Sequence, residues 1–90
     1  MKLHLVLKHK WYDMIASGEK PDEYRSRTPY WKKRLWDRRY EIEEIVLHRG
    51  YTSVTMTKKV VEIVEDAGKE EWGAEPLELY YVIKLKGGEE

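Results

Sequence analysis

The stretch SGEKPDEYRSR, residues 17–27, marks the point where a helix gives way to an extended segment. The apolar residues before it follow the i, i+3, i+4 spacing of a helical face, and Gly18 is a typical helix stop. Lys20 precedes a proline, which favours extended backbone, and Pro21 cannot donate to a β-ladder. We therefore predict a helix over about residues 9–17, followed by a short edge strand.

Working outward from this stretch, the rest of the chain is mostly β. Thr28 and Pro29 suit the N-cap and first position of a second short helix. The segment LELYYVIKL, residues 77–85, alternates so that its leucines, Tyr81 and Ile83 share one face. Further strands are predicted at residues 3–7, 41–48 and 54–66, the last with a bulge near Lys58 and Lys59. Two short helices and about five strands without a βαβ repeat predict an α+β domain that curls into a small barrel.

Length and composition predict one small intracellular domain. The 90 residues are 41% hydrophobic, which suits a single core over residues 1–86, with residues 87–90 as a frayed tail. There is no cysteine, and the N-terminal KLHLVLKHK contains no continuous apolar run, so we expect a cytoplasmic monomer without a disulfide or a membrane partner. The three histidines are scattered along the sequence, and we expect neither a metal site nor a cofactor.

Charge is divided along the chain, although the formal net charge is zero. Residues 25–39 contain seven basic side chains and a single acid, Asp37. Residues 62–78 contain seven acids and a single base, Lys69. The average therefore hides a basic patch, which is a feature of proteins that bind nucleic acid.

The segment GEKPDEYR, residues 18–25, resembles the G-x-K-x-x-E-x-R signature of the ASCH (activating-signal-cointegrator homology) superfamily, whose fold is a PUA-like β-barrel. Small members of this family have a similar order of an opening strand, a first helix, a PYWKKRL segment, an HRGY turn and a late GKEEWGAEP loop. The resemblance implies a cleft lined by Lys20, Glu23 and Arg25 and a role in binding RNA or modified nucleobases.

Residue chemistry is compatible with that role. In a strand, Glu23 and Arg25 project to the same face about 7 Å apart. The carboxylate could accept from an exocyclic amino group while Arg25 or Lys20 contacts a phosphate. Alternatively, these charges pair with one another on a solvated surface. If they serve a ligand, Lys20→Ala and Glu23→Gln should leave stability nearly unchanged or raised, and Arg25→Ala should cost more.

The aromatic and basic residues after the signature leave two interpretations open. Tyr30, Trp31 and Trp36 could stack bases, but packing on the barrel is favoured for both tryptophans and for Leu35. Among the basic residues, we expect RNA contacts from Arg27, Lys32 and Lys33. The HRGYTS turn offers Arg49 and Tyr51 as phosphate contacts, or is only a turn.

An enzymatic function is the alternative. A subset of small ASCH proteins is similar and deacetylates acetylated cytidine with a lysine, a threonine three positions later and a distal glutamate. Lys20 matches the lysine, but Glu23 occupies the threonine position, so any catalytic pair of Lys20 and Glu23 would act differently. The distal acid could be Glu70, Glu71 or Glu75. An amidohydrolase acting on N-acylated cytidine is thus the second hypothesis, and metal-assisted RNA cleavage the third.

Overall fold

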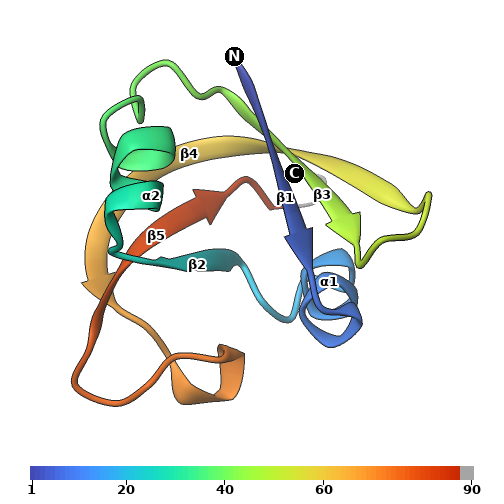
Figure 1. Ribbon diagram of the computed structural model, residues 1–90. Coiled ribbons are helices and arrows are strands. Elements are labelled where there is room, and N and C mark those ends of the chain that lie inside the picture. The colour runs from blue at the N-terminus through green and yellow to red at the C-terminus, as the bar shows by residue number, and fades with distance from the viewer. Residues whose placement is uncertain (88–90) are drawn as a thin grey trace.

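Five strands form one mixed sheet that curls into a half-barrel, as the computed structural model of residues 1–87 shows (Figure 1). The strands are β1 (Lys2–Leu7), β2 (Asp22–Ser26), β3 (Glu44–Arg49), β4 (Thr55–Ala67) and β5 (Leu79–Leu85). Their order across the sheet is β1, β3, β4, β5, β2. Together with two short helices near the N-terminus, this arrangement confirms the predicted α+β class and number of strands. Residues 88–90 of the predicted frayed tail lie outside the described part of the chain.

β1 lies at one edge of the sheet and runs parallel to β3, with Leu5 opposite Leu47. Its period-two pattern turns Leu5 and Leu7 into the core, where both are buried. The remaining neighbours in the sheet are antiparallel. The parallel pair is possible because the chain between β1 and β3 is long enough to cross over, and that crossover contains both helices and β2.

The first helix, α1, spans His9–Ala16 and packs against the sheet through Tyr12 and Ile15. The predicted boundaries are therefore right to within one residue. Trp11 and Met14, which the spacing placed on the inward face, are only partly buried. Trp11 packs at the margin of the core, where its indole is available to the neighbouring surface.

The second helical segment begins at the predicted N-cap, Thr28, and changes from α-helical to π-helical geometry after one turn. The Thr28 hydroxyl accepts a backbone N–H at 3.2 Å, and the helix α2 occupies Pro29–Trp31. A π-helical turn, η1, follows over Lys32–Trp36. It is closed by a hydrogen bond from the Asp37 N–H to the Lys32 carbonyl at 2.8 Å. The predicted second helix is thus present in a shorter and partly π-helical form.

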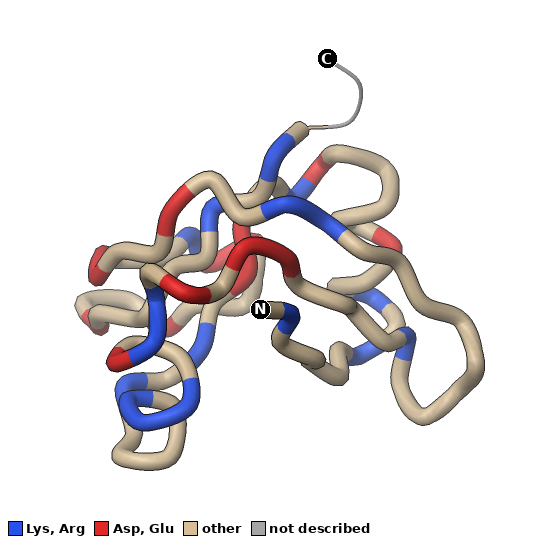
Figure 2. The backbone as a smooth tube through the Cα atoms, turned by 90° about the horizontal axis from the view of Figure 1, so that it is seen from above, with Lys and Arg blue, Asp and Glu red and all other residues tan. Residues whose placement is uncertain are grey.

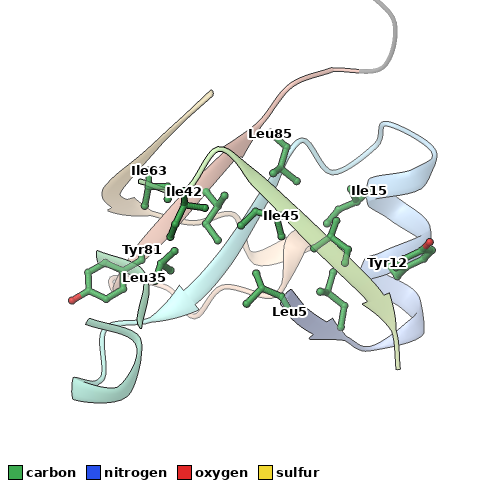
Figure 3. Packing of buried hydrophobic residues seen from close by; sticks show 12 residues of the cluster. Leu5, Tyr12, Ile15, Leu35, Ile42, Ile45, Ile63, Tyr81 and Leu85 are labelled. Carbon is green, nitrogen blue, oxygen red and sulfur yellow. The ribbon is translucent and has the colours of Figure 1, made fainter. Parts of the chain in front are cut away.

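Leu35 anchors η1 to the core, since its side chain is 0% exposed. Trp31 and Trp36 pack against the same core, which confirms the packing interpretation for both. The Trp36 ring is stacked on Tyr81, with 5.1 Å between centroids and an interplanar angle of 10°. Figure 3 shows Leu35 and Tyr81 at one end of the core and the α1 side chain Ile15 at the other.

β4 joins the two halves of the curled sheet. It pairs with β3 up to Lys59 and with β5 from Val60 onward. The register shifts between Val60 and Glu62, so the predicted bulge exists and lies slightly later than Lys58 and Lys59. This irregularity occurs where the strand changes partners and bends.

β5 is buried on both faces over most of its length, which the predicted alternation did not anticipate. Leu77 lies outside the strand with a φ of 60°, and both Leu77 and Leu79 are exposed. Tyr80 and Val82, expected on the outer face, are instead buried by a second apolar cluster. That cluster consists of Tyr24, Val64, Ala74, Tyr80 and Val82. The loop between β4 and β5 contributes Ala74 and so covers the outer face of β5.

The predicted curling of the sheet into a small barrel is observed as a half-barrel. β1 and β2 stand at opposite ends of the strand order, and within residues 1–87 no ladder joins them. One side-chain hydrogen bond crosses the seam, from Arg25 Nη2 to the Val6 carbonyl oxygen at 3.1 Å. The signature residue Arg25 therefore lies where the sheet fails to close.

Candidate functional site

A left-handed glycine turns Lys20 toward the interior. Gly18 has a φ of 88°, a conformation that favours a residue without a Cβ. The Lys20 N–H then donates to the Met14 carbonyl at 3.0 Å, and the Pro21 carbonyl accepts from the Leu85 N–H at 3.2 Å. The connection from α1 to β2 is thus held at both ends, and Lys20 is only 2% exposed.

Lys20, Glu23 and Arg25 form a chain of two ion pairs centred on the Glu23 carboxylate. Lys20 Nζ lies 2.9 Å from Oε1, and Arg25 Nη2 lies 2.9 Å from Oε2. Lys20 Nζ also donates to the Asp22 carbonyl oxygen. Lys20 and Glu23 are buried, so the charges do pair with one another, but in the interior rather than on a solvated surface.

Arg25 has hydrogen-bonding capacity that the described part of the chain leaves unused. Its Nη2 serves both Glu23 and the Val6 carbonyl. Its guanidinium lies over the Trp31 ring, 5.0 Å from the centroid. Its Nε is buried and has no hydrogen-bond partner within residues 1–87. A buried guanidinium N–H without a partner is an uncommon arrangement in a native interior.

A pocket of about 360 Å³ opens over Lys20 and Glu23, and we call it the Lys20 pocket. Aromatic and acidic side chains supply much of its wall: Trp11, Tyr24, Trp72, Glu75 and Glu78. Of the three late glutamates that the sequence left open, Glu75 lines this pocket, whereas Glu70 and Glu71 are not among its described lining residues. The pocket combines a buried ion pair with two indole rings.

Trp11, Trp72 and Glu78 are among the pocket residues that sequence reasoning missed as candidates. Trp11 was assigned to the inward face of α1, and its partial burial is what leaves it at the pocket. Trp72 ends a short 3₁₀ turn, η2 (Glu70–Trp72), inside the late loop. An isolated tryptophan in a charged loop was the available signal, because so large an apolar ring is seldom left in a solvated turn.

Burial changes the titration of two side chains beside Lys20. Burial raises the pKa of the Tyr24 phenol, whose oxygen accepts the Lys69 backbone N–H at 3.1 Å. Burial also raises the pKa of the Asp22 carboxyl, against the opposing effect of Lys84. The signature segment thus lies in a poorly hydrated environment, where hydrogen bonds to a ligand are stronger than in water.

A second pocket, of about 530 Å³, lies on the other side of the ion-pair chain, and we call it the Tyr51 pocket. It includes Lys8, Arg25, Tyr30, Trp31 and Tyr51 among its lining residues. The signature residues are therefore divided: Lys20 and Glu23 line one pocket and Arg25 lines the other. Glu23 contacts one cation of each pocket, Lys20 and Arg25.

The basic residues after the signature are partly engaged with acids. Arg27 pairs with Glu65 at 3.2 Å, and Lys32 pairs with Asp37 at 2.9 Å, which raises the pKa of Lys32. Lys33 instead lines a shallow pocket of about 450 Å³. The other residues of this Arg34 pocket are Tyr30, Arg34 and Arg38. Figure 2 shows Lys and Arg gathered on the coil that α2 and η1 form.

Arg49 is turned toward α1. Its Nε and Nη2 donate to the two carboxylate oxygens of Asp13, each at 2.9 Å. The adjacent Tyr51 is 96% exposed. Of the two candidates in this turn, Arg49 therefore holds the turn against the helix, and Tyr51 is the one presented to solvent.

The Asp13–Arg49 pair should make stability depend on pH. The hydrogen bonds from Arg49 lower the pKa of Asp13 below its usual 3.8. A carboxyl with a lowered folded-state pKa stabilises the fold above its unfolded pKa and loses this effect as pH falls through the folded pKa. Arg49→Gln should therefore be less stable than wild type at neutral pH, and the difference should shrink as pH falls below 3.8 and vanish once pH is below the lowered pKa of folded Asp13. Urea denaturation at a series of pH values measures the free energy of unfolding of both proteins. If wild type stays more stable than Arg49→Gln at the most acidic pH, Arg49 stabilises the fold by packing and not by its ion pair.

Two histidines that are distant in sequence meet on the sheet. His4 Nδ1 and His48 Nε2 are 2.8 Å apart across β1 and β3. Within residues 1–87, no three His, Asp or Glu side chains are grouped to hold a metal ion. Over the same residues, no helix has the length and apolar character needed to cross a membrane.

Comparisons with protein-family models, curated proteins and solved structures found no match.

Proposed function

We propose that this chain is a small ASCH-type domain with a PUA-like fold, and that it binds RNA or a nucleotide-like ligand in the Lys20 pocket. The order of strands and helices agrees with the order of motifs on which the family resemblance rests. Lys20, Glu23 and Arg25, three of the four fixed signature positions, lie in one ion-pair chain. The fourth, Gly18, provides the left-handed turn that brings Lys20 inward.

The observation that supports this proposal most directly is the buried Lys20–Glu23 pair in a pocket lined by two indoles. Trp11 and Trp72 offer flat apolar surfaces on which a nucleobase can stack. Lys20 can donate to a base carbonyl, while Glu75 can accept from an exocyclic amino group. A few fixed polar groups within an aromatic wall are typical of sites for planar ligands.

The charges of the pocket indicate which part of a nucleotide it receives. Glu75 and Glu78 line it together with the Lys20–Glu23 pair, whose charges compensate each other. A phosphate would be repelled by these carboxylates, whereas a neutral base would not. The base therefore belongs in the Lys20 pocket and the phosphates outside it, toward the basic residues.

Tryptophan resonances provide the test. Titration with nucleosides, nucleoside monophosphates and short RNAs should shift the indole N–H signals of Trp11 and Trp72 more than those of Trp31 and Trp36. Trp72→Ala should weaken binding roughly tenfold, because stacking on an aromatic ring contributes about 1–3 kcal/mol per base. Tyr40→Ala, which removes an aromatic ring that is 89% exposed elsewhere, is the matched control and should bind as wild type does. Unshifted indole signals with every ligand would refute the proposal.

An amidohydrolase is the second candidate, because Glu75 lies in the same pocket as Lys20. Against it, Glu23 stands where the related enzymes have threonine, and both of its oxygens are bound by cations. In that ion pair Lys20 acts as a hydrogen-bond donor, which suits binding better than proton abstraction. Incubation with N-acylated cytidine distinguishes the two: product formation that Lys20→Met abolishes would favour the hydrolase.

A further inference from the structure

The Tyr51 pocket lies at the open seam of the half-barrel and is separate from the Lys20 pocket. Its wall comes from the end of β1, from Arg25 on β2, from α2 and from the turn after β3. The turn is held in place at two points. The Gly50 N–H donates to the Leu7 carbonyl at 2.8 Å, and Arg49 binds Asp13 on α1. The pocket is therefore preformed by backbone and side-chain contacts.

The ionisable groups lining this pocket suit an anion. Its two charged side chains are Lys8 and Arg25, and no acid is among its described lining residues. Lys8 directly precedes α1 without a capping hydrogen bond from its side chain, and it takes part in none of the ion pairs within residues 1–87. Arg25 retains the buried Nε that has no partner in the described chain. This contrasts with the acidic wall of the Lys20 pocket.

The same pocket presents aromatic rings to solvent. Tyr51 is 96% exposed and Tyr30 is 55% exposed. Tyr30 packs edge-on against Trp31, with 4.9 Å between centroids, and the guanidinium of Arg34 lies 4.7 Å from its ring centroid. Proteins bind single-stranded nucleic acids with exposed aromatic rings, on which bases stack, and with neighbouring cations, which contact the backbone.

Tyr30 connects this pocket to a longer basic surface. It lines both the Tyr51 pocket and the Arg34 pocket. The other residues of the Arg34 pocket, Lys33, Arg34 and Arg38, are all basic. A strand that leaves the Tyr51 pocket over Tyr30 therefore meets further cations along η1.

We propose that the Tyr51 pocket is a second subsite, which binds a phosphate through Lys8 and Arg25 and stacks the adjoining base on Tyr51 or Tyr30. This inference rests on the proposed function, because it takes the Lys20 pocket as the first base site. The ion-pair chain lies between the two subsites, with Arg25 lining one and Lys20 the other. The ligand is accordingly a single strand of at least two nucleotides rather than a free nucleoside.

The experiment compares a strand with its monomer. Hexacytidylate and hexauridylate RNAs and the corresponding nucleosides are titrated into wild type and the double variant Lys8→Gln/Tyr51→Ala. Affinity for the hexamers should fall at least tenfold, and nucleoside affinity should not change, since stacking and one phosphate contact are both lost. The magnitude of the slope of log affinity against log salt should fall by about one. Lys86→Gln/Tyr40→Ala makes the same chemical changes at other exposed positions and should bind as wild type does.

The outcomes separate this inference from the proposed function. If nucleosides bind the Lys20 pocket and the double variant binds hexamers normally, the second subsite is refuted and the proposed function stands. If the variant loses nucleoside and hexamer binding equally, the subsites are not separate and the inference also falls. If neither ligand binds wild type, the proposed function fails first.

A measurement on wild type alone guards against a variant that folds poorly. The backbone amide signals of Lys8, Gly50 and Tyr51 should shift with the hexamers and stay in place with the nucleosides. Shifts of equal size with both ligands, or with neither, would overturn the inference even if the variant does not fold.

Discussion

Glu23→Gln should lower the free energy of unfolding by about 3–5 kcal/mol, since removing one partner of a buried ion pair leaves the remaining charge uncompensated. The substitution keeps the size of the side chain and removes its charge. Lys20 and Arg25 would then both face a neutral amide, although each is bound at 2.9 Å to a carboxylate oxygen. Denaturation by urea, followed by circular dichroism, measures the change.

Lys20→Met provides the contrasting variant. It removes the buried ammonium and leaves Glu23 paired with Arg25, so it should cost less than Glu23→Gln. Arg27→Gln breaks an exposed pair with Glu65 and should change stability by less than about 1 kcal/mol. Equal stability of wild type and Glu23→Gln would contradict the buried pairing. The buried pairing thus predicts a loss of stability for Glu23→Gln, where the sequence alone predicts a stability that is nearly unchanged or raised.

Leu35→Ala should cost about 2–5 kcal/mol, the range for truncating a fully buried leucine. Leu35 is 0% exposed and is the buried residue of η1. In Figure 3 it lies at the same end of the core as Ile42 and Tyr81. Its truncation would leave a cavity under the coil that carries the basic residues, so the variant should also bind hexanucleotides more weakly.

Leu79→Ala is the matched control. It makes the same leucine-to-alanine change at a position in β5 that is 45% exposed. This change should cost less than about 1 kcal/mol, as expected for a surface position. Thermal or urea denaturation of both variants gives the comparison. Similar losses for Leu35→Ala and Leu79→Ala would mean that η1 is not held to the core through Leu35.

The sequence predicts elements that are defined by local chemistry. Pro21 identified β2 as an edge strand, and the structure places it at one end of the sheet. Thr28 identified the start of α2 through its hydroxyl. The burial of Tyr80 and Val82 was not predictable in this way, because the side chains that cover them come from β2, β4 and the loop before β5. Such coverage depends on residues far apart in sequence, which periodicity does not detect.

The charged centre of the candidate site was predictable from the sequence, whereas its aromatic wall and its arrangement were not. The signature named Lys20, Glu23 and Arg25, which the structure brings together. They are divided between two pockets because Arg25 lies at the open seam between β1 and β2, and no local sequence pattern predicts that these two strands meet there. Trp72 joins the Lys20 pocket because its loop folds back over β2, a contact between residues about fifty positions apart.

The ion pairs among Lys20, Glu23 and Arg25 also affect which register β2 adopts against β5 during folding. β2 is a five-residue edge strand that, within residues 1–87, pairs only with β5, and the register of so short a strand is weakly fixed by its own backbone pairing. A slip by one residue would exchange the two faces of β2, moving Glu23 and Arg25 together to the opposite side and separating them from Lys20 and from the Val6 carbonyl. That misaligned state would leave the buried Lys20 ammonium without its carboxylate partner, at a cost of several kcal/mol. The same three side chains that we assign to the ligand therefore favour the native register of β2 over a slipped one. A substitution among them that alters ligand binding also alters the free-energy difference between these two registers.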